Sequence, residues 1–156
     1  MYRTTVLSLL FLLPILSTAI QWFMPEPEPY VLPALALKWF VFWGVGVRLL
    51  LAGFSQWLRP QNTAQLLGLQ HEDALFPIRE LGFANIALGV LGAVSVMVWS
   101  WRFPAAVAGV VFYGLVGINH VGAGKRGAGE KTAMWTDMVF ALVLLVLAVM
   151  VWRTHK

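Results

Sequence analysis

The chain has 156 residues, of which 60% are hydrophobic and only 12% are charged, with a formal net charge of +4. A soluble domain carries about twice that charged fraction, so the composition predicts an integral membrane protein with little mass outside the bilayer. The excess of basic residues is therefore expected to influence the topology of the chain in the membrane. The sequence has no basic surface interleaved with aromatics, so binding to nucleic acid is not predicted. The absence of cysteine excludes disulfides, thiolate metal sites and cysteine nucleophiles.

The first span is expected over residues 4–23. A single early charge, Arg3, precedes an apolar run, and Pro14 is expected to bend the helix that this run forms. Small residues at 17–19 also fit a signal-peptidase site, which leaves a secretory signal as the alternative. Residues 25–29 alternate proline with glutamate, and this stiff acidic connector cannot continue the helix.

The second span is expected over residues 34–58, with tryptophans toward its ends as in an aromatic belt. Arg48 lies near its midpoint, which places a permanent charge at membrane depth. After Pro60, a short amphipathic turn capped by Asn62 or Thr63 is expected at the level of the lipid headgroups.

The third span, expected over residues 79–99, combines an apolar run with polar groups. Arg79 and Glu80 stand at its start, and Asn85 lies further in. Glycines recur on the same helical face as Asn85, at Gly82, Gly89 and Gly92. Such a face lets a neighbouring helix approach closely in lipid, and the small-residue face of the fourth span is its expected partner.

The fourth and fifth spans are expected over residues 104–121 and 133–152, joined by a flexible basic loop. The fourth is rich in small residues and presents Tyr113 and His120 on one face. The fifth has Asp137 in its first turns and is otherwise aliphatic. A place so near the start of a helix makes capping one explanation for Asp137.

Five spans place the two termini on opposite sides of the membrane. With the amino terminus in the cytoplasm, the cytoplasmic basic residues outnumber the external ones, as the positive-inside rule requires. The cytoplasmic set is Arg3, Arg59, Arg79, Lys125, Arg126 and Lys131, and the external set is Lys38, Arg102, Arg153 and Lys156. The sequence therefore predicts a multi-pass protein with a cytoplasmic amino terminus.

Polar side chains from four spans converge on one end of the expected bundle. The second and fourth spans end on the side where the third and fifth begin, which gathers Arg48, Glu80, Asn85, Tyr113, His120 and Asp137. An ionisable group at membrane depth costs at least a few kcal/mol unless it is paired or hydrated. Arg48 therefore requires Glu80 or Asp137 as a partner, or a hydrogen bond to Asn85 or Tyr113. We expect these six residues to line a ligand pocket, with a purely structural role as the alternative.

The candidate pocket narrows the class of ligand. One histidine and two carboxylates lack the spacing of a metal site, and no serine elbow accompanies His120, so neither a metal nor a hydrolase is expected. An apolar small molecule such as a quinone fits better, because its site needs aromatic and aliphatic walls with a few convergent polar groups. Tyr113, His120, Glu80 and Trp135 could furnish such a site.

The chain carries VRLLLAG at 47–53, RELGFAN at 79–85, Asn119-His120 and Thr136-Asp137. This pattern, over about residues 38–150, resembles small uncharacterised bacterial membrane proteins of the DoxX-like group. That group is typically a four-helix membrane bundle, and some relatives are subunits of thiosulfate:quinone oxidoreductases. The resemblance implies a bacterial inner-membrane location and a core of spans two to five, with the first helix as an addition. It carries over no catalytic residue.

The sequence thus predicts an all-α integral membrane protein with five transmembrane helices, a four-helix core bundle and an N-terminal helix. Its expected partners are the lipid bilayer and either a larger membrane complex or further copies of the chain. The expected function is an accessory subunit of a membrane redox or photosynthetic complex. A quinone- or lipid-binding oxidoreductase component and a small transporter or channel are the alternatives.

Overall fold

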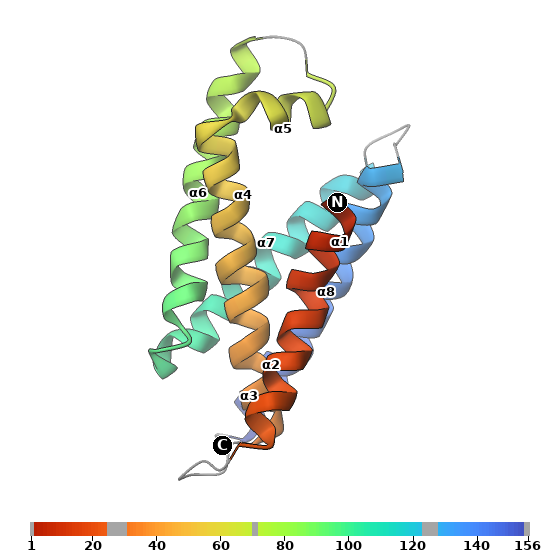
Figure 1. Ribbon diagram of the computed structural model, residues 1–156. Coiled ribbons are helices and arrows are strands. Elements are labelled where there is room, and N and C mark those ends of the chain that lie inside the picture. Colours follow the sequence, from red (N-terminus) through yellow and green to blue (C-terminus); the bar gives the residue numbers. More distant parts are fainter. Residues whose placement is uncertain (1, 25–30, 70–71, 123–127, 155–156) are drawn as a thin grey trace.

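The computed structural model describes residues 2–24, 31–69, 72–122 and 128–154, with the backbone alone at residues 2–3, 66, 120–122 and 128–133. Within this part of the chain, five helices are long and apolar enough to cross a membrane. They are Thr4–Trp22, Leu32–Leu58, Glu72–Val94, Trp99–Asn119 and Met134–Thr154. The predicted all-α membrane fold with five spans is confirmed (Figure 1).

Two spans are divided by π-helical segments, in which each backbone hydrogen bond joins residues five apart instead of four apart as in an α-helix. The first span comprises α1 (Tyr2–Leu7), η1 (Ser8–Leu12) and α2 (Leu13–Trp22), and the second comprises α3 (Leu32–Phe40), η2 (Val41–Val47) and α4 (Arg48–Leu58). The remaining elements are α5 (Pro60–Leu66), η3 (Glu72–Ala74), α6 (Leu75–Val94), η4 (Trp99–Trp101), α7 (Arg102–Gly122) and α8 (Ala128–Thr154).

The irregularity expected at Pro14 takes the form of η1. A proline inside a helix lacks an N–H, and its ring clashes with the carbonyl four residues earlier. The wider π-helical turn ends just before Pro14, which then lies at the start of α2. Pro60 likewise opens α5, where no described side chain makes a cap, so the expected cap at Asn62 or Thr63 is wrong.

The third span lies closer to the amino terminus than expected. Pro77 occupies the first turn of α6, where a missing N–H is tolerated, so the helix begins before it. At the other end, Val98 is extended, with φ −109° and ψ 102°. Arg102 donates from Nε to the Ser95 carbonyl at 3.2 Å and from Nη2 to the Val96 carbonyl at 3.4 Å. These bonds satisfy carbonyls that a helix end leaves open, and α6 stops at Val94.

The glycine face of α6 packs closely on the second span. A Cβ built on Gly92 would lie 2.5 Å from the Gly46 nitrogen, and one on Gly82 would lie 2.9 Å from the Gly53 carbonyl oxygen. Gly89 faces Leu50 in the same way. The predicted close approach is confirmed, but the predicted partner, the fourth span, is wrong. Glycines on both helices let the two backbones meet, which neither helix alone reveals.

The helices form two closely packed pairs, α4 with α6 and α7 with α8. In Figure 1, α4 and α6 stand side by side and diverge from α7 and α8 toward the end where α5 lies. Among the described residues, α4 itself makes few contacts with α7 or α8. The pairs are instead joined through α3 and η2, which pack against α8 and α7 respectively.

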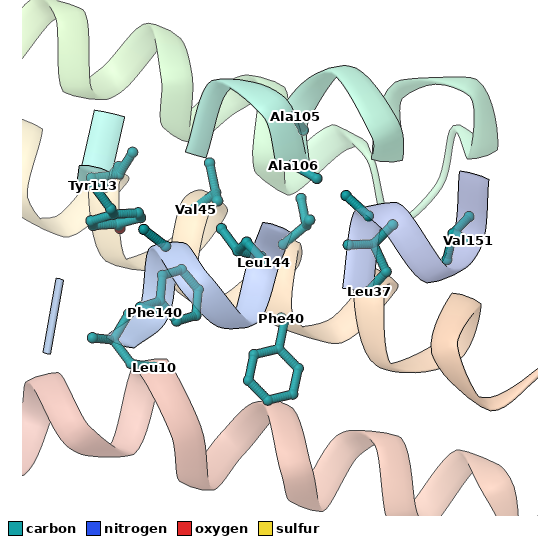
Figure 2. Packing of buried hydrophobic residues seen from close by; sticks show 14 of the residues in the cluster. Leu10, Leu37, Phe40, Val45, Ala105, Ala106, Tyr113, Phe140, Leu144 and Val151 are labelled. Atoms are coloured by element: carbon teal, nitrogen blue, oxygen red, sulfur yellow. The ribbon is translucent and has the colours of Figure 1, made fainter. Parts of the chain in front are cut away.

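The apolar core lies at this junction. Figure 2 shows Phe140 and Leu144 of α8 between Leu10 of the first span, Val45 of η2 and Tyr113 of α7. Each of these five side chains is fully buried. The first helix is therefore part of the core, because Leu10 fills it together with residues of the second, fourth and fifth spans.

Polar contacts also attach the first helix to α3 and η2. Lys38 Nζ and Trp39 Nε1 both donate to Gln21 Oε1, at 3.0 and 2.9 Å. Trp43 Nε1 donates to Ser17 Oγ at 2.9 Å. In this structure the small residue Ser17 serves helix association, which is the usual use of serine between membrane helices.

Candidate functional site

An ion pair joins the two helix pairs at membrane depth. Arg48 Nη2 donates to Asp137 Oδ1 at 2.8 Å, and the two side chains are only 14% and 6% exposed. The prediction that Arg48 pairs with either Glu80 or Asp137 is confirmed, and Asp137 is the partner. Such a contact relieves most of the cost of a lone charge in the bilayer.

Asp137 lies deeper than its place in the expected fifth span suggested. The helix α8 begins at Ala128, so the chain is already helical in the segment expected to be a loop. Asp137 therefore stands more than two turns inside α8, and capping at a helix start does not explain it. The extra turns bring its carboxylate to the level of Arg48, which itself begins α4.

The π-helical turn η2 shapes the surroundings of the ion pair. In an α-helix the Arg48 N–H would bond to the Gly44 carbonyl, but here it bonds to the Trp43 carbonyl. The Gly44 carbonyl instead accepts a short hydrogen bond from the Tyr113 hydroxyl. The Tyr113 ring lies against the Arg48 guanidinium, 4.8 Å from ring centroid to Cζ, a distance suited to a cation–π contact.

Phe140 closes this centre from the opposite side. A Cβ on Gly44 would overlap the Phe140 ring, so only glycine permits this packing. The Phe140 and Tyr113 rings meet edge to face, with centroids 5.0 Å apart and an interplanar angle of 89°. The Arg48–Asp137 pair is thus bordered by aromatic side chains.

Asn85 forms a second polar contact, within the α4–α6 pair. Its Nδ2 donates to Gln56 Oε1 at 2.7 Å, and Asn85 is 3% exposed. Asn85 therefore forms an interhelical hydrogen bond between α6 and α4. Two buried atoms, Arg48 Nη1 and Asn85 Oδ1, have no hydrogen-bond partner among the described residues, so each site keeps some capacity for a further polar contact.

One of the six candidate residues, Glu80, is not brought into this centre, and His120 cannot be compared because its side chain is outside the described residues. Glu80 is exposed on α6, which packs mainly on α4 rather than on α8. His120 lies near the end of α7, and its side chain is outside the described residues. Arg48, Asp137 and Tyr113 gather at this centre, whereas Asn85 bonds to Gln56 within the α4–α6 pair. Their role in ligand binding stays a prediction.

The clearest cavities lie at the opposite end of the bundle. One, of about 240 Å³, is bordered by residues of α3, η4, α7 and α8, including Trp99, Arg102 and Trp152. The other, of about 180 Å³, is an entirely apolar groove between α7 and α8. Phe103 and Trp152 border both, so the two spaces adjoin.

Sequence reasoning missed three residues of consequence. Gly44 is needed because the Phe140 ring occupies the place of a Cβ, and the signal was present as a glycine shortly before a mid-span arginine. Gln56 is the partner of Asn85. Arg102 was assigned to a surface turn, yet it is 7% exposed and borders a cavity. The tryptophans around it were the available signal for an interfacial site.

Comparison with known proteins gives a family without an assigned activity. Neither the curated proteins nor the solved structures contain a match. The match that exists spans almost the whole chain, from the first membrane helix to the last residue. On that match, over residues 4–156, the chain belongs to the family of unknown function DUF6790.

Proposed function

We propose that the protein is an accessory subunit of a larger membrane complex of the redox or photosynthetic type. The observation that carries this proposal is the use of the polar groups at membrane depth. Arg48 pairs with Asp137, Tyr113 donates to the Gly44 carbonyl, and Asn85 is bonded to Gln56. These contacts hold helices together, as expected of a rigid transmembrane body.

The outer surface supports the same proposal. Large apolar side chains are exposed along every span, for example Leu51 and Phe54 on α4, Leu115 on α7 and Leu142 on α8. Such faces suit lipid and suit the transmembrane helices of a partner, because membrane helices associate through packing rather than polarity. The resemblance to the DoxX-like group points in the same direction.

Purification in a mild detergent tests the subunit proposal. Native mass spectrometry of the tagged protein, solubilised gently from its own membrane, is expected to show a stoichiometric larger partner. A monomer or a homo-oligomer as the sole species, in detergents that preserve known complexes of the same membrane, would contradict the proposal.

We further propose the cell inner membrane as the location, with the amino terminus in the cytoplasm. The balance of basic residues supports this orientation. A carboxyl-terminal alkaline phosphatase fusion should then be active and a green fluorescent protein fusion dark, since five spans put that end outside. The reverse pattern would invert the topology.

A quinone-binding oxidoreductase component is the second candidate. The aromatic-lined cavity beside Arg102 favours it, because a ring and a hydrogen-bond donor are what a quinone head requires. Chemical extraction of the purified protein followed by mass spectrometry would show an isoprenoid quinone at near-stoichiometric amounts if this candidate is right.

A further inference from the structure

The two adjoining spaces at the α6–α7 end combine an apolar groove with a basic cavity. The groove is bordered by Val107, Val110 and Val111 of α7 and by Leu145, Ala148 and Val149 of α8. Several of these side chains are partly exposed, including Val111 at 54% and Val149 at 42%. The groove is therefore open to the lipid and has the shape and polarity to receive a hydrocarbon chain.

The adjoining cavity has a different character. Among the described residues that border it, Arg102 is the one that carries a charge, and Ser100 adds a hydroxyl. The Arg102 guanidinium lies over the Trp99 ring, with Cζ 4.3 Å from the centroid, and its bonds to the Ser95 and Val96 carbonyls fix its direction. Arg102 is only 7% exposed, so its positive charge is held at the wall of the cavity, where it favours an anionic group.

An aromatic pair stands where the two spaces meet. Phe103 and Trp152 are stacked, with centroids 5.4 Å apart and an interplanar angle of 30°. Tryptophan is characteristic of the membrane–water interface, so this pair marks the level at which a lipid headgroup joins its chains. The basic cavity then lies at headgroup depth and the groove at chain depth.

From this arrangement we infer that the α6–α7 end binds an anionic phospholipid, with its phosphate at Arg102 and one acyl chain along the α7–α8 groove. A basic residue at the level of the headgroups attracts anionic lipid. Each space is also smaller than the roughly 300 Å³ at the lower end of pockets that enclose a small molecule. Spaces of that size fit a ligand that the protein encloses only in part, as it does a bound lipid. The inference is independent of the subunit proposal, since a single chain forms the whole site.

Headgroup selectivity tests the role of Arg102. The full chain in neutral detergent is titrated with dioleoyl phosphatidylglycerol or dioleoyl phosphatidylcholine and examined by native mass spectrometry. We expect preferential binding of phosphatidylglycerol. Arg102→Gln should weaken that preference about fivefold, because one basic residue is worth about 1 kcal/mol toward anionic lipid. Arg102→Lys should keep most of it.

Arg153→Gln is the matched control, because Arg153 is an exposed cation at the same end of α8 and does not border the cavity. This variant should bind like the native protein. Equal binding of the two lipids by the native protein would overturn the inference. So would an Arg153→Gln variant that loses as much preference as Arg102→Gln.

A second pair of variants tests the groove without touching Arg102. Val149→Trp fills the groove from an exposed position, whereas Leu142→Trp adds the same bulk at a 59% exposed position outside it. The first should reduce binding of phosphatidylglycerol severalfold and the second should not. Equal effects of the two would overturn the inference. So would displacement of phosphatidylglycerol by an equimolar isoprenoid quinone whose own binding is unchanged in Arg102→Gln, since that result assigns the cavity to a quinone.

Discussion

At the scale of single residues, the structure turns on how a permanent charge is held in the bilayer. Arginine cannot shed its proton, so Arg48 must be paired where it lies. The structure meets this requirement with Asp137 at 2.8 Å and with the face of Tyr113. A buried ion pair is weak evidence for net stability, because desolvation offsets much of the attraction, but losing one partner leaves an uncompensated charge.

Single and double replacements at this pair should therefore differ sharply. We expect Arg48→Met or Asp137→Leu alone to cost about 3–5 kcal/mol of unfolding free energy. The double variant should cost much less than the sum, because it buries no charge. Thermal or denaturant unfolding in detergent, followed by circular dichroism, measures all three.

Additive losses would show that Arg48 and Asp137 do not act as a unit. Unchanged melting of both single variants would show that the pair contributes little to the fold. Arg153→Ala serves as the control, because Arg153 is an exposed cation at the end of α8.

At the scale of helices, the sequence predicted the elements better than their pairing. Hydropathy and length gave all five spans, because apolar runs of that length have few alternatives. The glycine face of α6 was visible too, but small residues recur on both the second and the fourth spans, at Gly46 and Gly53 and at Gly109 and Gly117. Residue spacing on one helix does not say which of two suitable faces it meets.

The candidate site, too, could be predicted from the sequence only in part. That Arg48 needed a partner followed from membrane physics, and Asp137 was one of two acids named for it. What the sequence could not supply was the helical start of α8 at Ala128, which sets the depth of Asp137. Nor could it supply the η2 turn that frees the Gly44 carbonyl. Glu80 remained a candidate because its exposure depends on which face of α6 meets α4.

A matched pair of glycine replacements tests the helix contact. In Gly92→Ala, the new methyl would lie 2.5 Å from the Gly46 nitrogen and 2.8 Å from its Cα, where no flexible side chain can yield. We expect a loss of about 1–3 kcal/mol, the usual cost of overpacking. Gly114→Ala meets nothing within 4 Å and should cause no loss, since alanine favours a helix. The melting temperature of each variant in detergent measures this difference. Equal melting temperatures of the two variants would contradict the close contact between the backbones of α6 and the second span.

At the scale of the whole molecule, the two helix pairs meet at a central junction and at the short connection from α6 to α7. The α4–α6 pair is held by glycines and by the Asn85–Gln56 bond, none of which involves α7 or α8. Between the pairs stand the Arg48–Asp137 contact, the Tyr113–Gly44 bond and the packing of Val45 against the position of Gly109. Weakening the junction should therefore loosen one pair from the other before it unpacks either.

Single introduced cysteines can report on the loosening of one helix pair from the other, because the chain has no cysteine of its own. Val45→Cys places a thiol at the junction, where Val45 is 0% exposed. Ile78→Cys places one at a buried position of α6, where Ile78 is 5% exposed. In an otherwise native chain in detergent, both should react slowly with a maleimide. Adding Asp137→Asn removes the charge partner of Arg48 at nearly constant volume, and the thiol at position 45 should then react severalfold faster while that at position 78 is unchanged. Mass spectrometry of the labelled protein gives both rates.

Equal acceleration at the two positions would mean that the bundle opens as one unit, and no acceleration at either would mean that the ion pair does not hold the two pairs together.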